Sequence, residues 1–192
     1  RRIRFTLLGV QSVMGRKGLN AMLKMAGLAR YMNALPADNK KYDAHTSEYA
    51  ELIQTIENHF GSNARTQLTR MGHGTFRNIY ETDKAKWQVH SLFNHFLPPR
   101  QRSINALTRL ATYLSEDNIQ SRIEVNAKGI VLIDHFSPAT WNRKRETEMC
   151  WLTLGAINEC VLWATGDAYE ITEETCKATG SEACRFVVGK EI

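Results

Sequence analysis

Three cysteines and one glutamate in the last third of the chain constrain the fold most strongly: Cys150, Glu173, Cys176 and Cys184. Their spacing suits a helix that carries Cys150, followed by a β-hairpin that carries the other three side chains. Thiolate sulfur and carboxylate oxygen are ordinary zinc donors, and four protein ligands leave no open coordination position, as in structural zinc sites. The spacing is therefore compatible with a zinc site that ties the hairpin to the helix.

Two other readings of the same cysteines stay open on spacing alone. They could be buried thiols, because free cysteine is among the most buried residue types. They could also include a disulfide between Cys176 and Cys184. Cys160 lies ten residues after Cys150, about 80° around a helix and about 15 Å along it. We therefore expect Cys160 to be a core thiol and not a further ligand.

The bulk composition favours an ordinary globular domain. The chain has 192 residues, 43% apolar residues and a net charge of +5, enough for one domain with a substantial core. Its basic residues are spread along the sequence instead of forming a stripe with interleaved aromatics, so we expect no direct binding to nucleic acid. No apolar run approaches the roughly 18 to 20 residues of a membrane span, and no signal peptide is recognisable. A cytoplasmic location is the corresponding prediction.

Hydrophobic periodicity predicts helices first and a small antiparallel sheet later, an α+β class in one domain over residues 1–192. A helix over 15–32 precedes one capped by Thr46 or Ser47 and ended by Gly61. Alternation of apolar and polar residues, followed by a turn that contains a glycine, then predicts a hairpin of the strands over 122–126 and 130–134. The remaining expected elements are a helix capped by Ser62 or Asn63 and running through Ile79, helices over 101–115 and 146–163, and strands over 168–172 and 184–188.

The segment from Glu173 to Phe186, EETCKATGSEACRF, resembles the closing motif of the 4-vinyl reductase domain family. Residues 150–155, CWLTLG, are similar to the helix that supplies the first zinc ligand in the aromatic-sensing members of that family. Those members are the input domains of phenol- and xylene-responsive transcriptional activators. The resemblance is sharp over residues 150–186 and loose over residues 14–28.

The resemblance implies a fold shared with the ligand-binding domains of nitric-oxide signalling and Golgi-transport proteins. It also implies a homodimer, an apolar internal pocket and structural zinc at Cys150, Glu173, Cys176 and Cys184. Haem is not expected, because the Tyr-x-Ser-x-Arg motif of the haem-binding relatives does not occur. Candidate pocket residues are the aromatics Phe76, Trp87, Phe93, Trp141, Trp151 and Trp163, with His73, His90, His95 and His135 as polar partners.

We therefore expect non-catalytic binding of a small hydrophobic or aromatic ligand, as a sensor or carrier. The alternative is a tetrapyrrole-binding protein or a reductase that acts on a vinyl group in bacteriochlorophyll biosynthesis. The sequence has no glycine-rich strand–turn–helix fingerprint for a nicotinamide or flavin, and a zinc with four protein ligands has no position for substrate. A third possibility is a dimeric scaffold, as in the Golgi-transport relatives.

Overall fold

The computed structural model of the chain describes residues 1–38, 44–88, 96–115, 119, 121–127 and 129–191. Helices dominate the first two-thirds, and a four-stranded antiparallel sheet follows, so the predicted α+β class is confirmed. The longer helices are α1 (Arg2–Met25), α2 (Thr46–Phe60), α3 (Ala64–Thr82), α5 (Pro99–Leu114) and α6 (Trp151–Thr165). The strands are β1 (Arg122–Asn126), β2 (Gly129–Asp134), β3 (Tyr169–Thr175) and β4 (Cys184–Glu191).

The first helix differs from its predicted range of 15–32. Helix α1 begins at Arg2, and Ile3, Phe5, Leu7 and Val10 of its first part are buried in the core. Gly15 has φ 69°, which kinks the helix and interrupts the apolar spacing on which the prediction depended.

The end of α1 and the start of α2 also need correction. Gly27, with φ 71°, follows the end of α1 at Met25, and a short 3₁₀ turn (Ala29–Tyr31) replaces the expected last helical turn. Helix α2 is capped by His45 and not by Thr46 or Ser47. The backbone N–H of His45 donates to Glu48 Oε2 at 2.9 Å, as in a capping box, where the side chain at the third helical position accepts the backbone N–H of the N-cap residue.

The later elements follow the predictions more closely. Helix α3 starts after Asn63, as expected, and the hairpin strands are within one residue of their predicted bounds. Helix α6 starts five residues later than the predicted 146, so Cys150 lies at its N-cap. Strands β3 and β4 each extend three residues further than predicted at their C-terminal ends.

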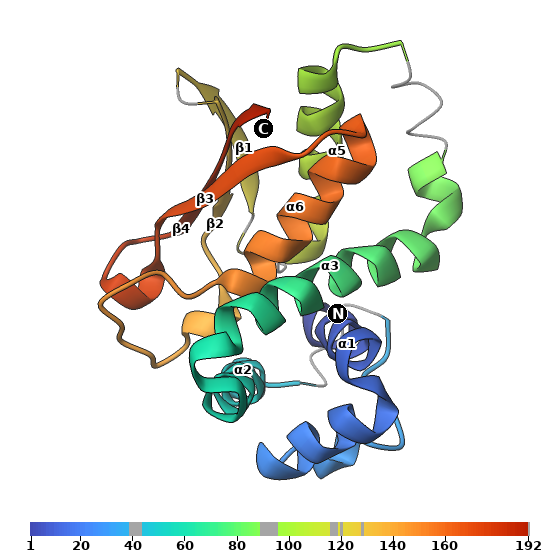
Figure 1. The fold of residues 1–192 in the computed structure, drawn as a ribbon, viewed down its shortest axis with the longest axis vertical. Helices are drawn as coiled ribbons and strands as arrows, with labels where there is room; N and C mark the ends of the chain where they lie inside the picture. The colour runs from blue at the N-terminus through green and yellow to red at the C-terminus, as the bar shows by residue number, and fades with distance from the viewer. Residues whose placement is uncertain (39–43, 89–95, 116–118, 120, 128, 192) are drawn as a thin grey trace.

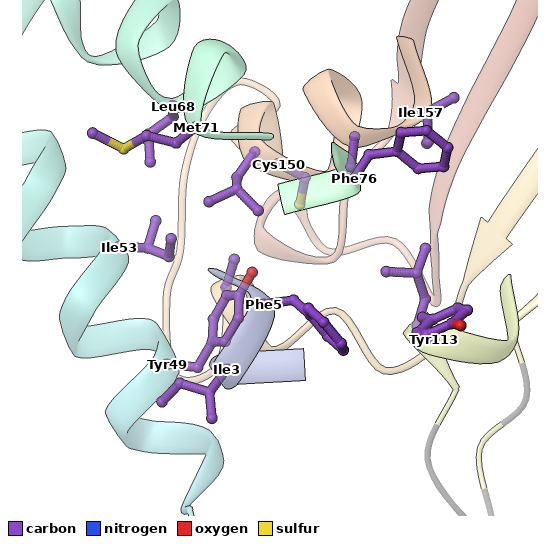
Figure 2. Packing of buried hydrophobic residues seen from close by; sticks show 14 of the residues in the cluster. Ile3, Phe5, Tyr49, Ile53, Leu68, Met71, Phe76, Tyr113, Cys150 and Ile157 are labelled. Atoms are coloured by element: carbon purple, nitrogen blue, oxygen red, sulfur yellow. The ribbon is translucent and has the colours of Figure 1, made fainter. Parts of the chain in front are cut away.

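The sheet has the order β1-β2-β4-β3, so the two hairpins meet at the β2–β4 pair. Figure 1 shows α6 running between the sheet and α3, with α1 and α2 on the far side of α3. Figure 2 shows core side chains from several of these helices converging on one interior, with Cys150 among them. Because Cys150 lies in this interior, the N-terminal end of α6 is buried, and its free backbone N–H groups need hydrogen-bond partners inside the protein.

Two glycines allow helices α3 and α6 to cross in close contact. A Cβ added to Gly72 in α3 would lie 2.1 Å from the carbonyl oxygen of Leu152, and one added to Gly155 in α6 would lie 2.1 Å from that of Thr69. The role of Gly72 in the fold is to let α3 and α6 approach within backbone contact, one turn from Cys150.

Gly72→Ala should therefore destabilise the protein by about 1–3 kcal/mol through overpacking. Alanine is favoured over glycine in helices by about 1 kcal/mol, so a net loss isolates the steric clash. Urea unfolding of this variant and of Thr66→Ala, at an exposed position of the same helix, provides the measurement. We expect Thr66→Ala to stay within about 0.5 kcal/mol of wild type; equal stability of Gly72→Ala would contradict the tight crossing.

Candidate metal centre

The four residues singled out by the sequence lie together in the structure. Cys150 is the N-cap of α6, Glu173 is in β3, Cys176 follows β3 directly, and Cys184 is the first residue of β4. One ligand atom from each side chain lies within 4.8 Å of the other three. The Cys150 sulfur is 3.5 Å from that of Cys184 and 3.9 Å from that of Cys176. This group could hold a metal ion.

A β-bulge brings Glu173 and Cys176 to the same side of the sheet. Residues three apart in a regular strand point to opposite faces. Here Glu173 pairs with Phe186 and Thr175 pairs with Arg185, so Glu174 is an extra residue on β3. Glu173 consequently shares the inner face with the buried Phe186, while Thr175 shares the outer face with Arg185. The bulge resets the alternation and lets both ligand residues face Cys150.

The loop after β3 is folded around the cysteine cluster. The carbonyl of Cys176 accepts hydrogen bonds from the backbone N–H groups of Thr179 and Ser181 at 3.1 and 3.3 Å. Gly180, with φ 98°, makes the turn possible. The backbone N–H of Lys177 lies 3.3 Å from the sulfur of Cys184 and donates to it. Such an N–H donor favours the thiolate form that a metal ligand requires.

Glu173 links the hairpin to the start of α6 and leaves one oxygen available. Its Oε2 accepts the backbone N–H of Cys150 at 2.8 Å, which satisfies a donor at the buried end of the helix. Its Oε1 is buried and has no hydrogen-bond partner among the described residues. A buried carboxylate oxygen without a partner is costly unless a cation or proton satisfies it. The donor set and this free oxygen therefore fit a bound cation.

The pKa values of Glu173 and the cysteines show that most of these groups stay protonated unless a cation is bound. Burial, and then the charge of Cys176, raises the pKa of Glu173 to about 8. Hydrogen bonds among the three thiols lower the pKa of Cys176 and, together with burial, raise the pKa of Cys150 well above its ordinary value. Without a cation, the cluster can therefore hold one ionised side chain but not several. A divalent cation must displace the remaining protons, so its affinity falls as the pH is lowered.

The three cysteines of the cluster are buried. The three cysteines are at most 2% exposed, and Glu173 is half-buried. All four cysteines of the chain are free, and the Cys176 and Cys184 sulfurs are 4.0 Å apart, so the disulfide alternative is not what the structure shows. Cys160, on α6, is fully buried in the protein core and is not part of the cluster, as predicted.

A hydrogen-bonded chain connects the cluster to the N-terminal helix. Ser137 Oγ lies 3.3 Å from the sulfur of Cys150. Asp134 Oδ1 accepts the backbone N–H of Ser137 at 3.1 Å, and Asp134 Oδ2 accepts Nη2 of Arg2 at 2.6 Å. Both Arg2 and Asp134 are buried. Ser137 has φ 33°, a strained conformation for a residue other than glycine, which the bond to Asp134 helps to hold.

Arg2 also borders a small internal cavity between the helices. The cavity has a volume of about 20 Å³, enough for about one water molecule, and its walls are mostly apolar. Its three aromatic residues, Phe5, Tyr49 and Tyr113, were not predicted from the sequence as pocket residues. Apolar periodicity predicts that a side chain is buried, but it does not show which cavity the side chain borders. The lining is Arg2, Phe5, Thr6, Tyr49, Thr75, Ile79, Leu110, Tyr113, Leu114, Leu152, Thr153 and Ala156.

Those predicted pocket residues that the structure describes do not line this cavity. Phe76, Trp87 and Trp163 form an aromatic cluster with ring centroids 5.2–6.2 Å apart. Trp151 is half-buried, and Trp141 is 50% exposed. His73 pairs with Glu159 at 2.8 Å, and His135 lies beside Arg122 at the sheet. Phe93, His90 and His95 lie outside the described residues.

Comparisons with known proteins place the fold but not a family. No protein-family model matches the chain. An uncharacterized protein of Methanocaldococcus jannaschii is 31% identical over 91 residues, which are 46% of this chain and 40% of that relative. The chain thus matches less than half of the relative's length.

Solved structures of H-NOX proteins resemble the whole chain. An H-NOX protein from S. oneidensis in the Fe(II)NO ligation state matches with a TM-score of 0.60 and 14% identity, over 100% of this chain and 99% of that one. A triple mutant of an S. oneidensis H-NOX protein in the Fe(II) state matches with a TM-score of 0.57 and 14% identity, over 98% and 95% of the two chains. At this identity the likeness confirms the predicted fold and shows nothing beyond the fold.

The internal cavity between the described helices is too small for a haem. A third similar structure, with a TM-score of 0.57 and 11% identity, is one in which haem distortion in the H-NOX family was probed. The cavity of about 20 Å³ is far smaller than a haem, and its lining among the described residues contains no histidine, cysteine or methionine.

No helix among the described residues is both long enough and apolar enough to cross a membrane.

The Arg2–Asp134 pair yields a pH-dependent prediction. Burial acts to raise the pKa of Asp134, but the Arg2 charge and hydrogen bonds overcome it and lower the pKa below its ordinary value. The stabilisation is therefore present above about pH 4 and is lost as the pH falls through the lowered pKa. Asp134→Asn should cost about 3–5 kcal/mol at pH 7, because it leaves Arg2 buried without its counter-ion.

Urea unfolding from pH 7 to pH 3 tests this prediction, with Glu81→Gln as the control because Glu81 belongs to an exposed pair with Lys84. The stability difference between wild type and Asp134→Asn should shrink as the pH falls, while Glu81→Gln should change stability by at most about 1 kcal/mol. A difference that is independent of pH would show that the ionised form of Asp134 does not stabilise the fold.

Proposed function

We propose that this chain is a non-catalytic ligand-binding domain whose hairpin is fixed to α6 by structural zinc at Cys150, Glu173, Cys176 and Cys184. The observation that carries the proposal is the buried cluster of three thiols and one carboxylate, in which Glu173 Oε1 has no partner among the described residues. Three sulfur donors favour zinc over the oxygen-binding cations calcium and magnesium.

The proposed role of the metal is to stabilise and not to catalyse. Zinc would join three segments that are distant in sequence, namely the N-cap of α6, the end of β3 and the start of β4. Four protein ligands with little exposed surface leave no place for a substrate. A metal held in this way contributes its binding free energy to folding, typically on the order of 10 kcal/mol.

The proposed ligand is a small hydrophobic or aromatic molecule bound in the cavity between the helices. Leu152, Thr153 and Ala156 of α6 line this cavity and begin only two residues after Cys150. A volume of about 20 Å³ must grow to admit an aromatic ring, so binding must displace a lining helix. Occupancy would then move the start of α6 relative to the hairpin.

Two connections would carry that movement to the metal centre. The first is the covalent continuity from Thr153 to Cys150 along the first turn of α6. The second is the chain from Arg2 through Asp134 and Ser137 to the Cys150 sulfur. The proposed resemblance to the aromatic-sensing members of the 4-vinyl reductase family, and the fold likeness to H-NOX proteins, support a sensor over a scaffold.

The tetrapyrrole alternative has no specific support. A tetrapyrrole is far larger than the cavity of about 20 Å³, and the part of the lining that the structure describes has no histidine, cysteine or methionine to act as an axial ligand. Homodimer formation stays a prediction from the family resemblance.

The zinc proposal predicts one zinc ion per chain in protein purified without added metal. Cys176→Ala should lose the metal and several kcal/mol of stability, because the hairpin is no longer fixed to α6. Cys160→Ala is the matched control, since it removes an equally buried thiol outside the cluster. It should keep one zinc and show only the cost of a small cavity. Native mass spectrometry and elemental analysis provide both counts, and loss of zinc in both variants or in neither would contradict the assignment.

The sensor proposal predicts a change in hydrogen exchange when an aromatic molecule binds. With phenol as the probe, amides in residues 146–186 of the zinc-loaded protein should become slower to exchange, as occupancy orders the start of α6 and the hairpin. Glycerol, a polar molecule, serves as the control and should leave exchange unchanged. Saturable phenol binding without any change in residues 146–186 would contradict the proposed coupling.

A further inference from the structure

The outer face of the sheet carries a hollow of about 320 Å³, on the side opposite to the cysteine cluster. A volume of this size lies within the range of small-molecule sites. Its floor is apolar, with Ile133 fully buried and Ala183 nearly so. The lining residues are Arg122, Ile133, His135, Thr175, Ser181, Glu182, Ala183 and Arg185, and we call this hollow the outer groove.

Strand register places two arginines side by side across the groove. Arg122 of β1 pairs with Ile133 of β2, which pairs with Arg185 of β4, which pairs with Thr175 of β3. Directly paired residues share a face of the sheet, so one row across all four strands presents two guanidinium groups on either side of a buried isoleucine. Like charges on one face repel each other and need anions nearby.

One carboxylate, that of Glu124, accepts hydrogen bonds from both arginines. Glu124 Oε1 accepts Nε and Nη2 of Arg122 at 3.2 and 3.0 Å, and its Oε2 accepts Nη2 of Arg185 at 3.1 Å. Nη1 of Arg122 lies 3.0 Å from Nε2 of His135, which must accept because guanidinium only donates. The Nε and Nη1 groups of Arg185 have no partner among the described residues.

The charges around the outer groove do not cancel. Lys177 reaches its edge, where Nζ donates to the carbonyl of His135 at 2.7 Å. Arg122, Arg185 and Lys177 give three positive charges, and Glu124 and Glu182 give two negative ones, so the net charge is +1. This charge matches a monoanion better than a dianion. The buried floor of Ile133 and Ala183 offers contact to an apolar body beside the anionic group.

We infer that the outer groove is a binding site for a small organic carboxylate, with Arg185 as its principal anchor and Arg122 as the second. Guanidinium groups bind carboxylates through paired N–H donors, and Arg185 has such donors unused. The site is independent of the proposed internal ligand, because it lies on the other face of the sheet. Its wall includes Thr175 and Ala183, the residues next to Cys176 and Cys184.

The test is a titration of the zinc-loaded protein with benzoate, followed by the amide resonances of the groove. We expect saturable shifts in residues 122, 133, 135, 175 and 181–185, with a dissociation constant of about 1 mM. Arg185→Met keeps an unbranched side chain without the charge and should weaken binding at least tenfold. Arg122→Met should also weaken it. Arg70→Met, at an exposed position of α3, is the control and should bind as wild type does.

Each other outcome overturns the inference. Absence of saturable shifts would show that the groove does not bind a carboxylate. Benzoate shifts centred on Leu152 and Thr153 would place the molecule in the internal cavity, in line with the sensor proposal but not with this one. Equal affinity for inorganic phosphate would show that the groove responds to charge alone. Much tighter binding of a glutamate-rich peptide would make it a surface for an acidic partner instead.

Discussion

The buried group of Cys150, Glu173, Cys176 and Cys184 is the interaction on which the rest of the structure depends. Three thiols and a carboxylate within 4.8 Å of one another cannot all be ionised without a cation, as the raised pKa of Glu173, about 8, shows. With a cation they would fix the N-terminal end of α6 to the β3–β4 hairpin. Helix α6 in turn packs between the sheet and α3, so the position of its first turn sets the glycine crossing with α3 and one wall of the internal cavity.

The same group lies at one end of a path to the N-terminal helix. Arg2 borders the cavity and pairs with Asp134, and Asp134 holds the turn that places Ser137 beside the Cys150 sulfur. Two sites that share a rigid element and a buried hydrogen-bonded chain can be coupled, and such coupling is reciprocal. A ligand that displaces the start of α6 would change the fit of the metal, and the metal would limit how far α6 can move.

The sequence was sufficient for the class of the fold and for the identity of the clustered residues, and insufficient for how they meet. Thiols and a carboxylate have few chemical roles in common, so Cys150, Glu173, Cys176 and Cys184 could be grouped from type and spacing. The bulge at Glu174 could not be foreseen, because it depends on strand register and breaks the alternation on which strand predictions rest. The start of α1 at Arg2 was missed for a related reason, since Gly15 interrupts its periodicity. The cavity residues Phe5, Tyr49 and Tyr113 were missed because burial in a sequence pattern does not show which void a side chain borders.

X-ray absorption at the zinc K-edge of the purified protein tests the proposed metal centre most directly. We predict a first coordination shell of three sulfur atoms at about 2.3 Å and one oxygen at about 2.0–2.2 Å. That shell corresponds to the three clustered cysteines and Glu173, with Cys160 outside it. A shell of four sulfurs, or one made only of nitrogen and oxygen, would contradict the proposal, because the metal would then be held by a different set of residues.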